Sequence, residues 1–216
     1  MDLYLIRHGE SKQNTRENFD DRLPDHKVEL TETGIKQSHK AGIFLESFLK
    51  ENDIDINNAV IWVSPFLRTR QTFQIINEYL NFNDVREDYS LIEQRYGLFS
   101  DRSIMRNKML FQDEFEFYNN YYQNDGKFYV KFPQGEAPMD VALRTRQFLS
   151  MINSEDKSPV FVLSHGITLK TIVMNTFMCS PEWFNAEPVM DNCAIRIINK
   201  DLNTDKYIYG GPKLQK

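Results

Sequence analysis

The sequence predicts an α/β fold, a three-layer α/β/α sandwich with a mostly parallel central sheet. Three short apolar runs, at residues 2–6, 59–63 and 159–163, are typical of buried strands. Segments with helical periodicity separate these runs, and strands that alternate with helices favour a parallel sheet. With 216 residues, 41% of them hydrophobic, the chain can bury one sizeable core. We therefore expect a single domain over residues 1–216.

The expected elements follow one another with few gaps. Thr31 is suited to cap the first long helix, because its hydroxyl can accept a hydrogen bond from an N–H of the first turn. In chain order we expect a strand at 2–6, a helix at 31–50, a strand at 59–63, a helix at 68–80, a strand near 89–92, a helix at 136–154, a strand at 159–163, a helix at 167–178 and a strand near 194–198. Residues 97–135 lack such a pattern and are expected to form an irregular insertion, long enough to cap a site and to set specificity.

Residues suited to bind an anion follow three of the predicted strands. The first strand runs into Arg7, His8 and Gly9, the strand at 159–163 runs into residues 164–166 (SHG), and Arg68 follows the strand at 59–63. In an open α/β sheet, ligands bind beyond the carboxyl ends of the strands. Two arginines and two histidines there, without Asp, Glu or Cys at metal-ligand spacing, describe an anion site, because guanidinium groups match phosphate oxygens. The anion that fits best is a phosphoryl group.

Four motifs resemble those of the histidine phosphatase (phosphoglycerate-mutase-like) superfamily. They are LIRHGES at residues 5–11, LTxxGxxQ at 30–37, SPxxRxxQT at 64–72 and SHG at 164–166. They occur in the order found in that family and span nearly the whole chain. Together they are a specific signal, so the chain is identified as a member, and the resemblance implies a phosphoglycerate-mutase-like fold.

The resemblance implies a role for each residue at the strand ends. His8 is the expected nucleophile that becomes phosphohistidine, with Arg7, Arg68 and His165 holding the phosphoryl oxygens and Asn14 joining them. The chemistry agrees, since a neutral imidazole attacks phosphorus only where positive charge offsets the repulsion from an anionic ester. Three cations supply that charge if His165 is protonated.

The leaving alcohol needs a proton, and the resemblance assigns the general acid to Glu93, in LIEQRYG at 91–97. A Glu kept protonated near neutral or mildly acidic pH can serve as acid and then as base toward water. Glycine lets the backbone approach a ligand closely. The further substrate-binding residues that we expect are Ser11, Gly9, Gly166, Arg95 and Tyr96.

The insertion and the segment after it carry weaker signals. Residues 133–137 look like the Pro-x-Gly-Glu-Ser segment of phosphatase branches, with Ala137 in place of Ser. Glu136 either supports the site or caps the helix, and both interpretations stay open. The aromatic residues of the insertion are expected to pack, whereas its first cations could reach a substrate: Arg95, Arg102, Arg106 and Lys108.

The function that fits best is hydrolysis of a small phosphomonoester without a metal or other cofactor. Phosphoglycerate mutase is the alternative within the same chemistry, and a catalytically inactive phosphate-binding or scaffold protein is the alternative from another class. Turnover is favoured over the latter because the five catalytic residues are intact: Arg7, His8, Arg68, Glu93 and His165. No role is assigned to His26, His39 or Arg70.

Composition limits the partners and the location. A net charge of -5 argues against nucleic-acid and membrane-surface binding, which depend on positive charge. The chain has two cysteines, Cys179 and Cys193, no apolar stretch near the ~20 residues of a membrane span and no signal-peptide pattern. We expect a reduced, cytoplasmic protein, and its oligomeric state stays open, a homodimer being one option.

Overall fold

The computed structural model describes residues 2–15, 23–100, 108–154 and 156–212. Its centre is a six-stranded sheet of order β3-β2-β4-β1-β5-β6. The strands are β1 (Leu3–Arg7), β2 (Val60–Val63), β3 (Val85–Glu87), β4 (Val160–Ser164), β5 (Ile195–Asn199) and β6 (Thr204–Tyr209). Neighbouring strands pair in parallel from β3 to β1, and β5 runs antiparallel to both β1 and β6. The mostly parallel sheet predicted from the sequence is confirmed.

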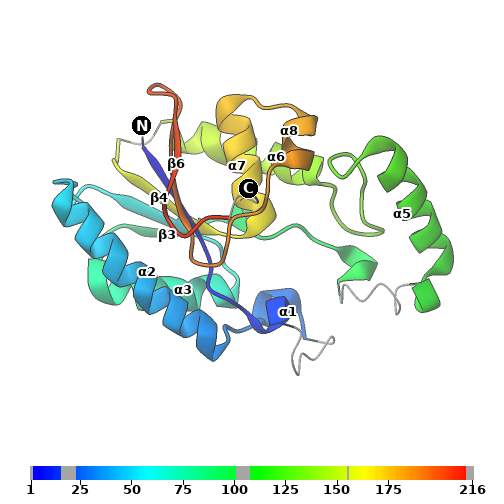
Figure 1. Ribbon diagram of the computed structural model, residues 1–216, viewed down its shortest axis with the longest axis horizontal. Helices are drawn as coiled ribbons and strands as arrows, with labels where there is room; N and C mark the ends of the chain where they lie inside the picture. Colours follow the sequence, from blue (N-terminus) through cyan, green and yellow to red (C-terminus); the bar gives the residue numbers. More distant parts are fainter. Residues whose placement is uncertain (1, 16–22, 101–107, 155, 213–216) are drawn as a thin grey trace.

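Helices cover both faces of the sheet (Figure 1). The long helices are α2 (Glu32–Glu51), α3 (Leu67–Leu80), α5 (Gln112–Asp125), α6 (Pro138–Ile152) and α7 (Gly166–Phe177), and the short ones are α1 (Lys12–Thr15) and α8 (Pro181–Ala186). Side chains of a strand alternate between the two faces. Tyr4 and Ile6 of β1 therefore pack in one core with α2 and α3, whereas Leu3 and Leu5 pack in a second core with α6 and α7.

Local signals start several of these helices where the sequence predicts them. The Thr31 hydroxyl accepts from the Gly34 N–H at 3.0 Å, so Thr31 caps α2 as expected. The Asp140 carboxylate accepts from the Ala137 N–H at 2.9 Å, and Pro138 occupies the first turn of α6. The side chain of Asp140, and not that of Glu136, therefore caps the start of α6.

Several elements differ from the prediction. The strand expected near 89–92 is a 3-10 helix at Tyr89–Leu91, because the Asp88 carboxylate accepts from the Ser90 N–H at 2.6 Å and turns the chain; the strand lies earlier, at β3. The short helix α8 and the last strand, β6, were not expected. The insertion is not irregular throughout, since it contains α5 and a 3-10 helix at Gly97–Phe99.

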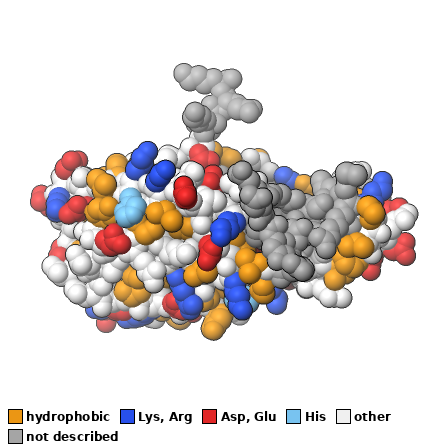
Figure 2. All heavy atoms as spheres, turned by 90° about the horizontal axis from the view of Figure 1, so that it is seen from below, with side chains coloured by type: hydrophobic (Ala, Val, Ile, Leu, Met, Phe, Trp, Pro, Cys, Tyr) orange, Lys and Arg blue, Asp and Glu red, His pale blue; other side chains and the backbone are white. Residues whose placement is uncertain are grey.

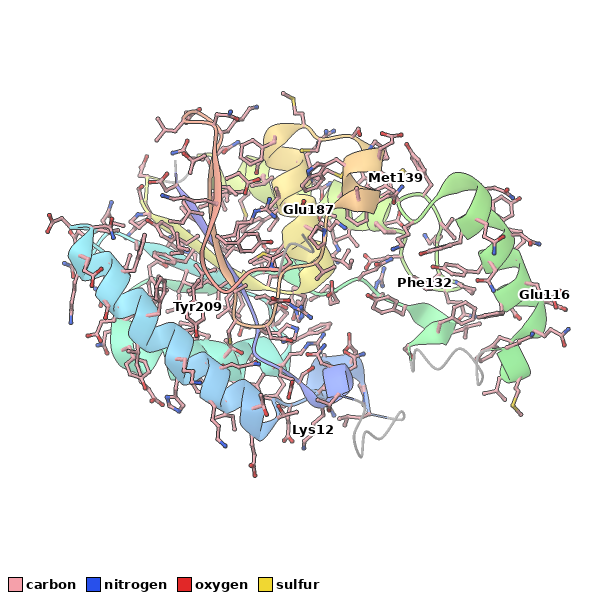
Figure 3. All side chains as sticks on the ribbon, in the orientation of Figure 1. Lys12, Glu116, Phe132, Met139, Glu187 and Tyr209 are labelled. Atoms are coloured by element: carbon pink, nitrogen blue, oxygen red, sulfur yellow. The ribbon has the colours of Figure 1, made fainter. Side chains whose placement is uncertain are left out.

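The inserted helix α5 lies to one side of the sheet, and Phe132 lies beside it, toward the body of the molecule (Figure 3). The ring of Tyr118 on α5 stacks on Phe132 with ring centroids 4.7 Å apart, and Phe99 contacts both rings edge-on. These contacts confirm that aromatic residues of the insertion pack against one another. Arg102 and Arg106 lie outside the described residues.

On the side of the molecule that α2 occupies, acidic and basic side chains are interspersed, and neither sign of charge dominates (Figure 2). Within the described ranges, no helix combines the length and the apolar character that crossing a bilayer requires.

Candidate active site

The register of the sheet brings the predicted strand ends together. Arg7 at the end of β1 is paired with Ser164 at the end of β4, and Leu163 beside it is paired with Val63 at the end of β2. The segments that begin at His8, Ser64 and His165 therefore leave the sheet at one edge. The rings of His8 and His165 lie with their centroids 5.1 Å apart.

His8 is oriented by the backbone. Its Nδ1 lies 2.6 Å from the Gly9 carbonyl oxygen. A carbonyl only accepts hydrogen bonds, so Nδ1 carries the proton and the neutral ring keeps its lone pair on Nε2. The backbone of the same residue is held on both sides, since the His8 N–H donates to Ser164 at 3.1 Å and the His8 carbonyl accepts from Asn192 Nδ2 at 3.0 Å. The ring therefore presents an unprotonated nitrogen from a fixed, buried position.

His165 is fully buried and lies among cations. Its Nε2 and the Ser64 hydroxyl are 2.8 Å apart. Burial first, and then the positive charge of the neighbouring arginines Arg68, Arg144 and Arg7, hold the pKa of His165 well below its usual range. Burial and nearby positive charge therefore favour neutral His165 in the unliganded site, so the protonated form on which a third cation depends is one that a bound anion would have to stabilise.

Arg68 and Arg7 remain as the cations of this edge. Arg68, with 1% of its surface exposed, donates Nη1 to the Asp25 carboxylate at 2.9 Å and to the Asp25 carbonyl at 2.8 Å. Nη1 of Arg7 donates to the Met190 carbonyl. Both guanidinium groups are thus positioned by the protein before any ligand binds.

Arg68 and His165 contribute two buried nitrogens that make no hydrogen bond among the described residues. They are Nε of Arg68 and Nδ1 of His165. Buried polar atoms are nearly always paired, and leaving one unpaired costs about 1–3 kcal/mol. An oxyanion that accepts from Arg68 and from a protonated His165 would satisfy both atoms. The site therefore fits an anion that brings negative charge and several acceptor oxygens.

Glu93 lies at the start of α7, next to the histidines. Its carboxylate accepts from the Gln94 N–H at 2.9 Å and from the Ile167 N–H at 3.4 Å. The Thr168 hydroxyl lies 3.5 Å from the same carboxylate and donates to the Ile92 carbonyl at 2.6 Å. These donors hold a carboxyl group that is only 8% exposed beside His165, the residue that precedes α7.

Asn14 and Ser11 form a turn beyond β1. The Asn14 side-chain oxygen accepts from both the N–H and the hydroxyl of Ser11, each at 3.0 Å. Asn192 Nδ2, which binds the His8 carbonyl, lies 3.4 Å from the same oxygen. Asn14 is exposed and is tied to His8 through Asn192, whereas Ser11 is fully buried and serves to orient Asn14.

Close packing explains why glycine occupies both predicted positions, Gly9 and Gly166. A Cβ at Gly9 would lie 2.6 Å from the Gly34 carbonyl, and the Gly9 N–H already donates to Thr72 at 3.0 Å. A Cβ at Gly166 would lie 2.4 Å from the Val189 side chain and 3.7 Å from Nε of Arg7. Gly9 thus allows β1 to pass close to α2, and Gly166 leaves room beside the Arg7 guanidinium.

Glu136 bridges two segments. Its carboxylate accepts from Nε of Arg144 at 3.2 Å and from the Arg95 N–H at 2.9 Å, and its backbone pairs with Gln94 and Arg95. It is 6% exposed, so it supports the chain just after Glu93 and does not cap the helix. The Arg95 side chain is 66% exposed, whereas the Tyr96 ring packs on Phe132 with centroids 4.9 Å apart.

Two of the residues left without a role, Arg70 and His39, have other partners. Arg70 forms a two-point ion pair with Glu87 at the surface, with both distances 2.6 Å, and Nδ1 of His39 lies 2.9 Å from the Tyr79 hydroxyl. No group of three or more His, Cys, Asp or Glu in the described parts of the chain is arranged to hold a metal ion.

Sequence reasoning missed three residues that position the site. Ser64 lies within a quoted motif, so its contact with His165 could have been considered. Asp25 begins a short 3-10 helix at Asp25–Lys27 and Asn192 lies in a turn. Neither segment has a recognisable pattern, and only the fold brings these residues to Arg68 and His8. Their signal is geometric and does not appear in the spacing of residues.

Comparisons with known proteins agree with this architecture. The pattern of the histidine phosphatase superfamily (branch 1) matches residues 3–206. The phosphoglycerate mutase-like protein AT74 of Arabidopsis thaliana is 30% identical over 211 residues, which cover 91% of this chain and 64% of that protein, so the chain spans less than two thirds of its length. The broad-range acid phosphatase DET1 of Saccharomyces cerevisiae is 20% identical over 95% of this chain and 87% of its own.

The fold also matches solved structures. A mycobacterial glucosyl-3-phosphoglycerate phosphatase, solved as a complex with VO3, superposes with a TM-score of 0.72 and 17% identity, over 98% of this chain and 99% of that one. At that identity the likeness concerns the fold alone. The match of the superfamily pattern over nearly the whole chain carries the assignment: this protein belongs to the histidine phosphatase superfamily, branch 1.

Proposed function

We propose that the protein is a phosphomonoester hydrolase that works through a phosphohistidine on His8. The proposal rests on one observation. The unprotonated Nε2 of His8 lies at the same edge of the sheet as two buried nitrogens, on Arg68 and His165, that lack hydrogen-bond partners among the described residues. A phosphoryl group brings the acceptor oxygens that these nitrogens lack. It also brings the electrophilic centre that the imidazole lone pair attacks.

The first half-reaction transfers the phosphoryl group to the protein. The Nε2 lone pair of His8 forms the N–P bond while the ester P–O bond breaks, and the alcohol oxygen takes a proton from the carboxyl group of Glu93. Arg7, Arg68 and His165 bind the equatorial oxygens, where positive charge stabilises the transition state. The His8 Nδ1–H stays on the Gly9 carbonyl and spreads the positive charge of the phosphohistidine.

The second half-reaction returns the protein to its starting state. Glu93, now a carboxylate, accepts a proton from water as the water oxygen attacks phosphorus and the N–P bond breaks. Inorganic phosphate leaves, and His8 regains its lone pair. Atoms and charge balance without an oxidant, a reductant or a metal, so we propose metal-independent turnover.

The comparisons support hydrolysis as the reaction. The yeast relative is named as a broad-range acid phosphatase, and the mycobacterial phosphatase of the same fold was solved with VO3, an oxyanion. We extend the proposal to a small phosphorylated substrate. We also propose a reducing, cytoplasmic environment, in line with two free thiols, of which the buried Cys193 has a pKa raised to about 12 by burial.

The test is to trap the intermediate. Rapid acid-free quench of the protein with a radiolabelled phosphomonoester should give acid-labile, alkali-stable phosphate on wild type and none on His8→Ala. His39→Ala, which changes a histidine of α2 that contacts Tyr79, is the matched control and should label like wild type. Stable labelling of His8→Ala would refute the assignment. Interconversion of 2- and 3-phosphoglycerate faster than phosphate release would replace the hydrolase with a mutase.

A further inference from the structure

A cavity of about 460 Å³ lies next to the catalytic edge and is not used by the proposed chemistry. It lies between α5, α7, α8 and the loops that contain Tyr96 and Phe132. Two of its lining residues lie close in the chain to catalytic ones, since Gln94 follows Glu93 and Ile167 is two residues after His165. Ligand cavities span ~300–1,000 Å³, so this one can hold a ring-sized group.

The cavity contains a buried ammonium group. Lys170 on α7 is 7% exposed, and its Nζ lies over the Phe184 ring, 4.3 Å from the centroid, and donates to the Glu187 carbonyl. The Glu187 carboxylate is held by Arg196 at 2.7 Å, so among the described residues Lys170 forms no ion pair. Lysine is rarely this buried without a charge partner. A negative charge bound in the cavity would pair with this ammonium group.

A second cation and an aromatic wall complete the cavity. Lys127 lines the same space from the segment after α5 and adds positive charge near Lys170. Tyr96, Tyr118 and Phe132 form one side, and they are fixed by their mutual ring contacts. Burial beside Tyr122 raises the pKa of Tyr118 to about 12, so this wall stays uncharged. The lining therefore suits an apolar body that ends in an anion.

We propose that this cavity binds the alcohol part of the substrate, and that this part is a ring-sized, largely apolar group carrying a second anionic group held by Lys170 and Lys127. The inference rests on the proposed phosphatase activity, because the phosphoryl group of the same molecule must lie at His8. Glu187, the carboxylate among the described residues that line the cavity, is held by Arg196, which also binds Asp205, and the two lysines outnumber it there.

The test compares two esters that differ in one charge, 4-carboxyphenyl phosphate and 4-carbamoylphenyl phosphate. We expect wild type to prefer the carboxylate ester by at least about tenfold in kcat/KM, as a charge-assisted contact with a buried cation implies. Lys170→Met should bring this ratio to within about twofold of one. Lys170→Arg should retain part of the preference, and Lys127→Met should lower it less, because Lys127 is exposed.

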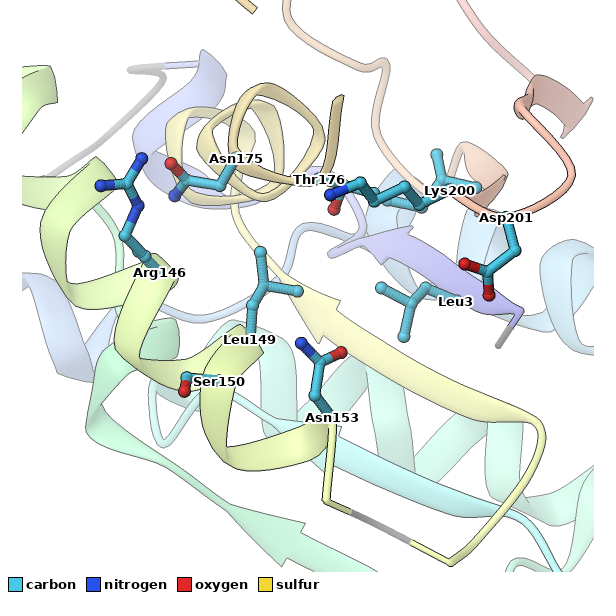
Figure 4. Close-up of a pocket in the computed structure, with 10 residues that line it drawn as sticks. Leu3, Arg146, Leu149, Ser150, Asn153, Asn175, Thr176, Lys200 and Asp201 are labelled. Carbon is cyan, nitrogen blue, oxygen red and sulfur yellow. The ribbon is translucent and has the colours of Figure 1, made fainter. Parts of the chain in front are cut away.

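The control comes from another cavity, of about 360 Å³, at the opposite edge of the sheet (Figure 4). Leu3 at the start of β1 and Asn175 near the end of α7 line it, so it lies far along both elements from the catalytic edge. Lys200→Met removes a cation from that cavity and should leave both esters unaffected. Thermal unfolding followed by circular dichroism checks that each variant is folded.

Each outcome separates the two proposals. Hydrolysis of both esters at equal rates by wild type, or a ratio that survives Lys170→Met, overturns the second-anion proposal and leaves the phosphatase intact. Better turnover of phosphoglycolate, an anionic ester without a ring, than of 4-carboxyphenyl phosphate overturns the proposal that the alcohol part is ring-sized. Absence of hydrolysis of all three esters, together with absence of phosphohistidine, overturns the phosphatase and with it this inference.

Discussion

The catalytic edge and the cavity between α5, α7 and α8 are neighbours that are built in different ways. His8, Arg68 and His165 come from chain segments fixed by the sheet register, and none of them is more than 3% exposed. The cavity is walled by side chains from an inserted helix whose outer face exposes Phe117 and Tyr121 by 62% and 49%. The site thus depends on the backbone of the core, and the cavity depends on side-chain packing. Changes in the first should stop the chemistry, whereas changes in the second should redirect it.

The largest effect expected is that of His8→Ala, which removes the nucleophile while leaving the cavity intact. Turnover should fall more than about a thousandfold for every ester, because covalent catalysis contributes several kcal/mol to lowering the barrier. The loss should be equal for neutral and anionic substrates. Steady-state phosphate release measures it, and a loss confined to one substrate class would break the division between the two regions.

Glu93→Gln should have the next largest effect, and it should depend on the leaving group. General acid catalysis contributes ~10²–10⁴-fold, so hydrolysis of an alkyl phosphate should slow about a hundredfold. Hydrolysis of p-nitrophenyl phosphate should slow less than tenfold, since nitrophenolate leaves without a proton. Equal slowing of both esters would show that Glu93 positions α7 through Ile167 and Thr168 and does not transfer a proton.

The same division explains what the sequence could predict. Arg7, His8 and His165 follow directly on apolar strands, so local pattern is enough to place them at one edge. Thr31 likewise caps α2 because the interaction spans three residues. Asp25 reaches Arg68 across 43 residues and Asn192 reaches His8 across 184, and no local rule encodes such contacts.

The errors have physical causes as well. Residues 89–92 look like a strand by composition, but one side-chain hydrogen bond from Ser90 to Asp88 makes a turn there. His165 is next to Arg68 only in space, so the burial and positive charge that lower its pKa are invisible in the sequence. The cavity between α5, α7 and α8 was not predicted, because its cations, Lys127 and Lys170, lie in different elements that come together only in the fold.

The lowered pKa of His165 predicts that anion binding takes up a proton. In the free site burial and nearby positive charge favour neutral His165, whereas a bound dianion favours its charged form, so its pKa is higher in the complex. Affinity must then fall as pH rises between the two pKa values, by up to about tenfold per pH unit. Tungstate is a suitable probe because it stays a dianion between about pH 6 and pH 8, the range in which a histidine normally titrates.

Calorimetric titration with tungstate at several pH values tests this coupling, and the number of protons taken up follows from the buffer dependence of the heat. His165→Gln keeps a hydrogen-bonding side chain without a titrating ring, so the slope should flatten in this variant. A slope that persists in His165→Gln would assign the proton to another group and would return His165 to a purely neutral role.

The smallest effect expected comes from Phe132→Ala, in the wall of the cavity. The Phe132 ring stacks on Tyr118 and contacts Tyr96, so its loss loosens the surface on which the alcohol part would lie. Among the described residues its ring contacts are with Tyr96, Phe99 and Tyr118 and not with the phosphoryl-binding residues, so kcat for a small ester should stay within about twofold of wild type. KM for 4-carboxyphenyl phosphate should rise by roughly three- to tenfold, because weaker ground-state binding raises KM and leaves kcat unchanged.

Truncating a half-buried aromatic side chain also lowers stability, so urea unfolding must show that the Phe132→Ala variant is folded under assay conditions. An equal fall in kcat for all esters would mean that the wall helps to hold Glu93 through Gln94 and Arg95, and that cap and site are one unit.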